Sequence, residues 1–261
     1  MRILVTGHKG FIGQNLTKAL IEQGHFVDGY EWLDQLPYLY EYDWVIHLGA
    51  ISTTTETNVE KIMDQNFDFS VKLINLCKEF GVNFQYASSA SVYGLKEEFK
   101  EDSPVNPLSP YAWSKYLFDR YVQQNYWGNI VQGFRYFNVY GPHEEHKGNQ
   151  ASPYHKFTEQ AKTTGNIKLF EGSDTFLRDF VPVEHVVDIH KKFLNIKESG
   201  IWNVGTGIAR SFKDIATEIA DKHKATITYI PMPANLKLQY QAYTKADITK
   251  LKATLNEASN S

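Results

Sequence analysis

Short apolar runs alternate with amphipathic segments through most of the chain. Residues 3–5 have the pattern of a short buried strand, and apolar side chains recur at helical spacing over residues 11–23, which predicts a strand followed by a helix. The same alternation continues and predicts strands over residues 25–31, 44–48, 84–88 and 130–140, with helices over residues 60–79 and 111–126. This order indicates an α/β fold in which helices cover both faces of a doubly wound parallel sheet.

One connection is shorter than this architecture needs. Only eleven residues, 32–42, separate the second predicted strand from the third. A crossover helix plus a further parallel strand requires more chain than that. We therefore expect one strand of the sheet to be missing, together with its helix.

The pattern changes after Pro142, where the elements become shorter. Ser211 and Asp214 stand three positions apart in a capping-box arrangement that predicts the start of a helix. We interpret residues 1–142 as a first domain and residues 143–261 as a smaller α/β lobe, partly interleaved with the first. The strands predicted in this lobe cover residues 201–204 and 227–230.

Composition narrows the classes of function. The chain has 261 residues, 42% of them hydrophobic, which is enough for a packed core. A formal charge of −3 leaves no strongly basic face for nucleic acid or for an acidic membrane surface. No apolar run is long enough to span a membrane and no signal-peptide pattern opens the chain, so we expect a cytoplasmic protein that binds neither nucleic acid nor membrane. Cys77 is the single cysteine, which excludes a disulfide framework. It lies in an apolar-periodic segment, which predicts a buried helix residue.

A glycine-rich turn follows the first strand and opens the first helix. Gly7, Gly10 and Gly13 are spaced three and three in this turn. Such glycines permit a tight turn, let the backbone approach phosphates and allow a helix to pack closely on a sheet, while the helix N-terminus attracts negative charge. The motif predicts a dinucleotide-binding site in a Rossmann-type domain.

Two side chains near this turn give opposite indications about the dinucleotide. Glu31, at the end of the second predicted strand, favours a free ribose 2′-hydroxyl and hence NAD. Lys9, just before the second glycine, would pair with a 2′-phosphate and so favours NADP, or it is simply an exposed loop cation. The residues alone leave the choice between NAD and NADP open.

A tyrosine and a lysine stand four residues apart on the helix predicted over residues 111–126. At this spacing Tyr111 and Lys115 share one helix face. A phenol becomes a usable base for an alcohol proton when a neighbouring ammonium favours its phenolate. Ser89 follows a predicted strand at the edge where α/β sheets bind ligands, and its hydroxyl would hold the reacting oxygen. Such a pair is usually two surface residues, but its place after the glycine turn and Ser89 favours a catalytic role.

Four motifs together carry a resemblance to a known family. They resemble the extended short-chain dehydrogenase/reductase family of sugar-nucleotide enzymes in TGHKGFIG (6–13), SSASVYG (88–94), YAWSK (111–115) and FRYFNVYGP (134–142). The resemblance implies a tightly bound NAD(P), with NADP favoured, and a catalytic set of Ser89, Tyr111 and Lys115. It also implies cofactor contacts from Gly7, Lys9, Gly10, Phe11, Ile12, Gly13, Glu31, Leu48, Gly49, Ala50, Ser52, Asn66, Tyr111, Lys115 and Val139.

Further motifs are similar to those of a narrower group, the ADP-L-glycero-D-manno-heptose 6-epimerases. These motifs are ISTTTE (51–56), YGPHEEHKGNQAS (140–152), KLFEGSDTFLRDFV (168–181) and YQAYTKADITKL (240–251). Enzymes of this group oxidise the heptose C6 to a ketone and return the hydride to the opposite face. The resemblance implies Tyr111 as one acid/base and Lys147 as a second across the sugar carbon, although the turn-like surroundings of Lys147 favour a loop cation.

The same resemblance implies a nucleotide-sugar substrate, a homo-oligomer and no metal. It assigns substrate contacts to Ser89, Asn138, Asn149, Lys156, Phe170, Glu171, Ser173, Arg178 and Tyr240, with Arg178 forking onto the diphosphate.

The chain departs from the family pattern at three places. Residues 32–42 hold no counterpart of the family's acidic residue or of the lysines that often accompany NADP, which keeps the cofactor choice open. His185 stands where an aspartate is usual. After Leu251 we expect no closing helix, so that part of the substrate lobe is trimmed.

Two alternatives remain beside the 6-epimerase. A UDP-sugar 4-epimerase of the same family flips its ketosugar past one tyrosine and needs no Lys147. A catalytically silent dinucleotide-binding protein would fit the missing strand, but the intact serine, tyrosine and lysine argue against it. A 4,6-dehydratase is disfavoured because Ala90 and Ser91 occupy the places of its acids, and a GDP-fucose-type epimerase-reductase because Cys77 lies on the helix before the Ser89 strand.

Overall fold

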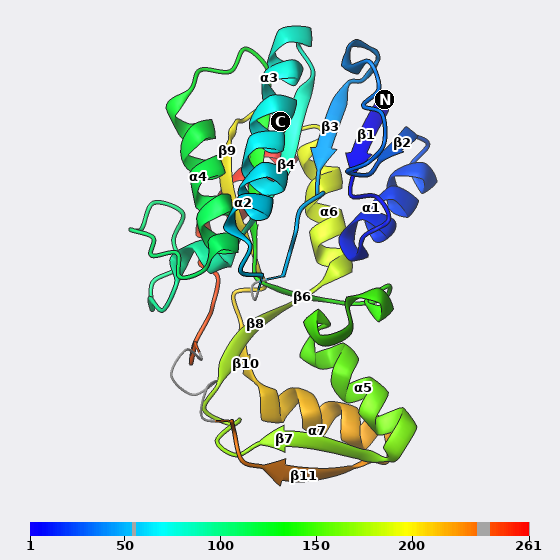
Figure 1. The fold of residues 1–261 in the computed structure, drawn as a ribbon, viewed down its shortest axis with the longest axis vertical. Coiled ribbons are helices and arrows are strands. Elements are labelled where there is room, and N and C mark those ends of the chain that lie inside the picture. The colour runs from blue at the N-terminus through cyan, green and yellow to red at the C-terminus, as the bar shows by residue number, and fades with distance from the viewer. Residues whose placement is uncertain (54–55, 234–240, 261) are drawn as a thin grey trace.

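The computed structural model describes residues 1–53, 56–233 and 241–260, which form two lobes (Figure 1). Among these residues, six strands form the sheet of the first lobe in the order β2-β1-β3-β4-β5-β9, and every neighbouring pair is parallel. The prediction of a Rossmann-type α/β fold is therefore confirmed. The strands are β1 (Arg2–Thr6), β2 (Phe26–Tyr30), β3 (Trp44–His47), β4 (Asn83–Ser89), β5 (Val131–Tyr136) and β9 (Gly200–Val204).

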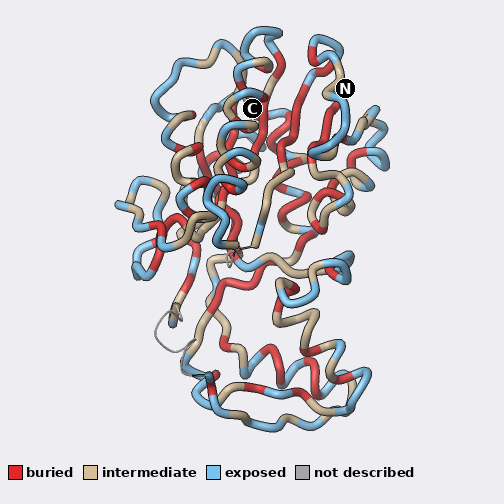
Figure 2. The backbone as a smooth tube through the Cα atoms, viewed as in Figure 1, coloured by how far each residue is buried: buried red, intermediate tan, exposed pale blue. Residues whose placement is uncertain are grey.

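Helices cover both faces of this sheet. Ile3 and Val5 of β1 pack toward one set of helices, whereas Leu4 between them packs toward the other set. Successive strand residues point to opposite faces, so Ile3, Leu4 and Val5 are all apolar because β1 is buried on both sides. Figure 2 shows the sheet buried along most of its length. Cys77 is buried in the second set, as predicted. The first set comprises α1 (Phe11–Glu22) and α6 (Val183–Phe193), and the second comprises α2 (Val59–Ile62), α3 (Phe69–Phe80) and α4 (Pro110–Gln124).

The connection between β2 and β3 lacks a strand, as predicted. Among its described residues, it holds one 3-10 turn, η1 (Leu39–Glu41), with no strand and no crossover helix. β2 is therefore the last strand on that side of the sheet. Leu39 is buried against the core beneath α3, so the short segment still closes that end of the core.

The helix predicted over residues 60–79 is continuous but changes its pitch. A π-helical stretch, η2 (Met63–Asp68), joins α2 to α3 without a break. Such a stretch widens the helix locally and is often found at functional sites. Here it contains Asn66, which is almost fully buried behind the loop that follows β3.

The prediction of one strand over residues 130–140 is wrong. β5 ends at Tyr136, and β6 (Asn138–Tyr140) belongs to a different sheet with the order β10-β8-β6. The chain leaves the first sheet at Phe137, whose backbone N–H donates to the Val204 carbonyl at 3.1 Å. The apolar pattern continues across this point, so only the change of pairing partner reveals the break.

The second lobe combines helices with two small sheets. The predicted capping box is confirmed, since Asp214 N donates to Ser211 Oγ at 2.9 Å and Ser211 N donates to Asp214 Oδ2 at 3.0 Å. α6 and β9 lie in the first lobe although they follow the start of the second lobe in the sequence. The domain boundary at residue 142 stays a prediction. Besides β6, the elements of the lobe are η4 (Glu145–Gln150), α5 (Pro153–Thr164), β7 (Asn166–Phe170), β8 (Leu177–Pro182), β10 (Ala209–Ser211), α7 (Phe212–His223) and β11 (Thr226–Ile230).

A last helix, α9 (Thr249–Asn260), packs against β9. The expectation that no helix closes the chain after Leu251 is therefore wrong. Leu251 and Leu255 stand one helical turn apart and pack into the core beneath β9, and Trp202 Nε1 donates to Thr254 Oγ1 at 3.1 Å. These few contacts seat a helix whose composition is otherwise polar.

Candidate active site

The glycine turn between β1 and α1 is shaped as a phosphate cradle. Gly7 has a φ of +69°, and a Cβ at Gly13 would lie 2.1 Å from the Gly7 carbonyl oxygen. Gly10 N donates to the same oxygen at 3.0 Å, which closes the turn in front of α1. Side chains at Gly7 or Gly13 would fill the cradle or force the helix away. The turn therefore fits the dinucleotide pyrophosphate that its sequence predicts.

The end of β2 presents a carboxylate beside this turn. Glu31 Oε1 accepts a hydrogen bond from Lys9 N at 2.8 Å and lies 3.2 Å from His8 Nδ1. It borders a small cavity of about 140 Å³. Tyr30 stacks on Phe69 at 5.6 Å between ring centroids beside this cavity, so an apolar wall faces the carboxylate. The residues lining it are Thr6, Gly7, Tyr30, Glu31, Trp32, Gly49, Ala50, Ile51, Gln65 and Phe69.

Lys9, Leu48 and Asn66 are among the predicted cofactor residues that do not line this cavity. The Lys9 side chain is exposed and borders a shallow hollow with His143. Leu48 packs into the apolar cores. Asn66 exchanges two hydrogen bonds with the Ile51 backbone, at 2.8 and 3.0 Å, and donates to Ser114 Oγ at 3.2 Å. Asn66 therefore ties the loop after β3 to α4 from behind.

The predicted catalytic pair lies on the first turns of α4. Ser109 caps this helix by accepting from Ala112 N, and a proline at its first position favours the helical start. Lys115 Nζ donates to the Ala87 carbonyl at 2.8 Å and lies 6.0 Å from the centre of the Tyr111 ring. The ammonium is therefore close to both Tyr111 and the end of β4.

Burial changes the acidity of both groups. It lowers the pKa of Lys115 to about 8, against an ordinary 10.5, and the Asp119 carboxylate opposes this effect. Burial also raises the pKa of Tyr111, while a hydrogen bond with the Ser89 side chain lowers it. Ser89 thus supplies the hydrogen bond that partly offsets burial.

A buried ion pair supports α4 from below. Arg135 Nε on β5 donates to Asp119 Oδ2 at 2.9 Å, and both side chains are at most 3% exposed. Tyr86 donates to Asp119 Oδ1 at 3.1 Å. Asp119 stands one helical turn after Lys115, and its carboxylate acts on both Arg135 and Lys115.

The active-site cavity, of about 670 Å³, collects most of the predicted site residues from both lobes. Lys147 enters it from η4 and lies 5.0 Å from the centre of the Phe11 ring. Burial lowers the pKa of Lys147. The cavity thus brings Lys147 to the same space as Tyr111. The predicted residues that line it are Phe11, Ile12, Ser52, Ser89, Tyr111, Asn138, Val139, Lys147, Asn149, Lys156, Phe170, Ser173 and Arg178.

The loop that carries Lys147 is fastened by a carboxylate that the sequence analysis missed. Glu144 is fully buried and accepts from Gly141 N at 3.0 Å, Ser152 N at 2.6 Å and Ser152 Oγ at 2.7 Å. These bonds join the two ends of the loop. Lys156 Nζ donates to the Asn149 carbonyl at 2.7 Å and holds the same segment from α5.

Two predicted substrate residues are not placed in the cavity. Glu171 does not line it, and its backbone N–H donates to the Ile230 carbonyl at 2.9 Å. Tyr240 lies outside the described residues. By contrast, Ser88 Oγ and Ser173 Oγ are buried at the cavity wall without a hydrogen-bond partner among the described residues, which is expected of groups that bind a ligand.

Several lining residues escaped the sequence analysis. They include Tyr136, which lies inside the FRYFNVYGP motif, and three aromatic side chains from the second lobe, namely Phe157, Phe176 and Phe212. Arg178 lies 5.6 Å from the centre of the Phe212 ring. The motif singled out Tyr136 without showing its use, whereas the three phenylalanines had no local signal.

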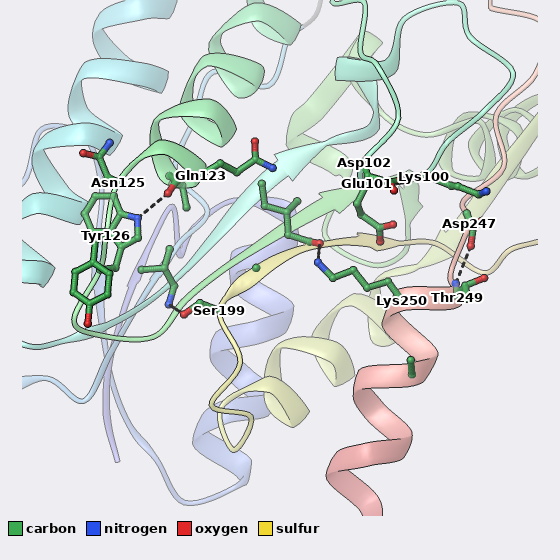
Figure 3. A pocket seen from close by; sticks show the side chains of 16 residues that line it. Lys100, Glu101, Asp102, Gln123, Asn125, Tyr126, Ser199, Asp247, Thr249 and Lys250 are labelled. Atoms are coloured by element: carbon green, nitrogen blue, oxygen red, sulfur yellow. Dashed lines mark hydrogen bonds between the residues drawn. The ribbon is translucent and has the colours of Figure 1, made fainter.

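A further cavity, of about 900 Å³, lies between the end of α4, the outer edge of β9 and the start of α9 (Figure 3). Lys250 Nζ donates to the Ile201 carbonyl at 2.8 Å, and Glu101 Oε1 accepts from Asn203 N at 2.8 Å. These side chains cap the outer edge of β9. None of the predicted catalytic residues borders this larger cavity, so its size is no evidence that it is the catalytic site.

The described part of the chain holds no group of three His, Cys, Asp or Glu side chains placed to bind a metal. None of its helices has the length and apolar content to cross a membrane.

The sheet, the glycine cradle and the serine, tyrosine and lysine beside it define a dinucleotide-dependent enzyme of the Rossmann type. The chain belongs to the NAD dependent epimerase/dehydratase family, whose model matches residues 3–205. This bears out the resemblance to the extended sugar-nucleotide enzymes.

Three solved structures are similar over nearly the whole chain. The ADP-L-glycero-D-manno-heptose-6-epimerase of Helicobacter pylori is 28% identical, with 98% of this chain and 90% of that chain covered and a TM-score of 0.87. An NAD-dependent NDP-hexosamine 5,6-dehydratase of tunicamycin biosynthesis is 26% identical, with coverage of 98% and 91% and a TM-score of 0.83. The UDP-glucose 4-epimerase of Thermus thermophilus, solved with NAD, is 26% identical, with coverage of 97% and 92% and a TM-score of 0.80.

Proposed function

We propose that this chain is an NAD-dependent ADP-glycero-manno-heptose 6-epimerase that uses two acid/base groups, Tyr111 and Lys147. The observation that carries the proposal is that these two side chains line the same cavity from different lobes. Inversion by oxidation and re-reduction needs two acid/base groups when the reacting oxygen lies on different sides of the cavity in the two half-reactions. The similarity to the Helicobacter pylori 6-epimerase supports this choice of substrate.

The residues of the chain divide the proton transfers between them. The nicotinamide supplies the hydride chemistry when it is bound. Tyr111 accepts the proton of the C6 hydroxyl, Ser89 holds the reacting oxygen, and the Lys115 ammonium favours the phenolate. After the 6-keto sugar has reoriented to present its opposite face to the hydride, Lys147 donates a proton to the C6 oxygen. Its pKa is lowered by burial, which brings an amine nearer to the range where it can both take and give a proton.

The geometry at Glu31 favours NAD over NADP. Its carboxylate lies at the end of β2 within hydrogen-bond distance of the glycine turn. A ribose 2′-hydroxyl would donate to this carboxylate, whereas a 2′-phosphate would meet a like charge. The NAD-bound Thermus thermophilus relative agrees with this choice. The cytoplasmic location and the homo-oligomer stay predictions.

Substitution of Lys147 tests the proposal. Lys147→Ala should lower epimerisation by about 10²- to 10⁴-fold, the usual contribution of a general acid or base. Reduction of bound NAD by one equivalent of ADP-heptose should persist, since Tyr111 still serves one face. Lys168→Ala is the matched control, because Lys168 lines the same cavity and loses the same charge.

Unchanged epimerisation in Lys147→Ala would refute the two-group mechanism. The one-tyrosine UDP-sugar 4-epimerase would then be tested with UDP-glucose as substrate. If neither sugar reduces the bound cofactor of the wild type, the hypothesis that remains is a catalytically silent dinucleotide-binding protein.

A further inference from the structure

A chain of buried hydrogen bonds begins at the wall of the active-site cavity and leads away from it through the sheet. Tyr136 lines the cavity, and its hydroxyl is hydrogen-bonded to His190 Nε2 on α6. His190 Nδ1 lies 2.7 Å from Gln85 Oε1 on β4. Gln85 Nε2 donates to Gln132 Oε1 on β5 at 2.9 Å. All four side chains are buried.

The direction of each hydrogen bond in this series follows from the contacts of Gln132, its last member. Gln132 Nε2 contacts the carbonyl oxygens of Ile196 at 2.8 Å and Glu198 at 3.2 Å. A backbone carbonyl oxygen only accepts, so Gln132 must present its amide nitrogen there and its oxygen to Gln85. Gln85 therefore donates from its nitrogen, which also reaches the His190 carbonyl at 3.3 Å, and presents its oxygen to the histidine ring.

The orientation of Gln85 decides the tautomer of His190. Because Gln85 Oε1 only accepts, the proton of the ring lies on Nδ1. Burial lowers the pKa of His190 to about 3, so the ring is neutral and Nε2 has a free lone pair. Tyr136 must donate its hydroxyl proton to that nitrogen. Burial raises the pKa of Tyr136, so the hydroxyl keeps this proton.

Tyr136 lies next to the reacting groups. The register of β4 and β5 pairs Ser89 with Tyr136, which places the two side chains on the same face of the sheet at its ligand-binding edge. An ionised Tyr111 is also close enough to raise the pKa of Tyr136 further. With its proton committed to His190, the Tyr136 oxygen can only accept a hydrogen bond from the cavity.

We propose that Tyr136 is a ligand-binding residue whose oxygen is a dedicated hydrogen-bond acceptor, held in that state by the positioning residues His190, Gln85 and Gln132. The group that it binds is an N–H or O–H donor, either the carboxamide of the nicotinamide or a hydroxyl of the sugar. This inference rests on the proposed function, since it assigns a further contact within the same site.

Two variants test the inference in different ways. Tyr136→Phe removes the acceptor and should weaken the ligand that carries the donor by about tenfold, the effect of leaving one buried donor unpaired. Gln85→Leu removes the acceptor of the His190 Nδ1 proton, so the ring no longer gains a hydrogen bond by keeping its proton on Nδ1. With the proton on Nε2, His190 donates to Tyr136, whose own proton turns to the cavity and opposes the ligand donor. The loss of affinity should therefore be similar to that in Tyr136→Phe.

The measurement is calorimetric titration with NAD, and with ADP-mannose added to the NAD-loaded protein. Phe134→Leu is the control, because the Phe134 ring packs 4.8 Å from the His190 ring and takes no part in the hydrogen bonds. It should lower the melting temperature and leave both affinities unchanged. If the buried hydrogen bonds have a merely structural role, all three variants should have a lower melting temperature and unchanged affinities for both ligands.

A selective loss of NAD affinity would assign the carboxamide as the donor, and a selective loss of ADP-mannose affinity would assign the sugar. If Tyr136→Phe and Gln85→Leu bind both ligands within about twofold of Phe134→Leu, the inference is wrong. If one variant does not fold, the other decides by the same criterion. Binding requires no turnover, so a wild type that binds both ligands but epimerises nothing would refute the proposed function alone.

Discussion

Replacing Lys115 by methionine should abolish turnover and change how the stability of the protein depends on pH. Methionine has a similar length and no charge, so it leaves an apolar side chain in a fully buried place. The ammonium of Lys115 is costly there, since burial lowers its pKa to about 8 from an ordinary 10.5. The proposed catalytic role of Lys115 therefore comes at the expense of stability.

The size of the effect follows from the two pKa values. In the unfolded chain Lys115 holds its proton up to about pH 10.5, whereas the folded protein releases it near pH 8. Between these values the unfolded state binds more protons, so the stability of the wild type rises with pH. A pKa difference of 10.5 minus about 8, at about 1.4 kcal/mol for each unit, gives about 3 kcal/mol across this window. Below pH 8 the full cost of the buried ammonium is present.

Urea denaturation of wild type and Lys115→Met at pH 7 and pH 10 measures this difference. The free energy of unfolding of the wild type, minus that of the variant, should be about 2 kcal/mol larger at pH 10 than at pH 7. The hydrogen bond from Lys115 to Ala87 is lost at both pH values in the variant, so most of its contribution cancels. Lys18→Met, which removes a largely exposed ammonium, serves as the control. A difference that stays constant between the two pH values would refute the reasoning.

Two further substitutions test the supports of the site. Glu31→Ser removes the carboxylate beside the glycine turn and should shift the ratio of NADP to NAD affinity by about tenfold toward NADP, measured by titration of cofactor-free protein; a ratio within twofold of the wild type contradicts the role of Glu31. Asp119→Asn leaves Arg135 buried without its carboxylate and should lower the free energy of unfolding by about 3–5 kcal/mol in urea denaturation. A loss below about 1 kcal/mol would show that Arg135 finds another partner.

The features predicted well from the sequence are those whose cause is local. The glycines of the first turn, the short connection between β2 and β3, and the Ser211–Asp214 capping box each act over a few neighbouring residues. The spacing of Tyr111 and Lys115 likewise fixes their common helix face wherever the helix packs. Such signals survive in the sequence because no distant partner is needed to complete them.

The features that were missed depend on pairing between distant segments. The break at Phe137 exists because the next residues join β8 instead of β4, and the apolar pattern is the same on both sides. Nothing in the sequence near Glu144 distinguishes it from other loop carboxylates, because its partner Ser152 lies eight residues further on. The role of Tyr136 required His190, which is 54 residues further along the chain. For these residues the sequence shows the side chain but not its partner.

The covered edge of β9 also affects how readily the protein aggregates when it begins to unfold. An edge strand with free backbone groups can pair with a strand of another molecule, which is a common route to aggregation. Lys250 covers one of these groups from the start of α9, and Glu101 covers another. When α9 frays, Lys250 leaves the strand and its carbonyl becomes available to a neighbouring molecule. Conditions that loosen this last helix should therefore start precipitation at this edge, which none of the predicted catalytic residues borders, while the candidate active site is still intact.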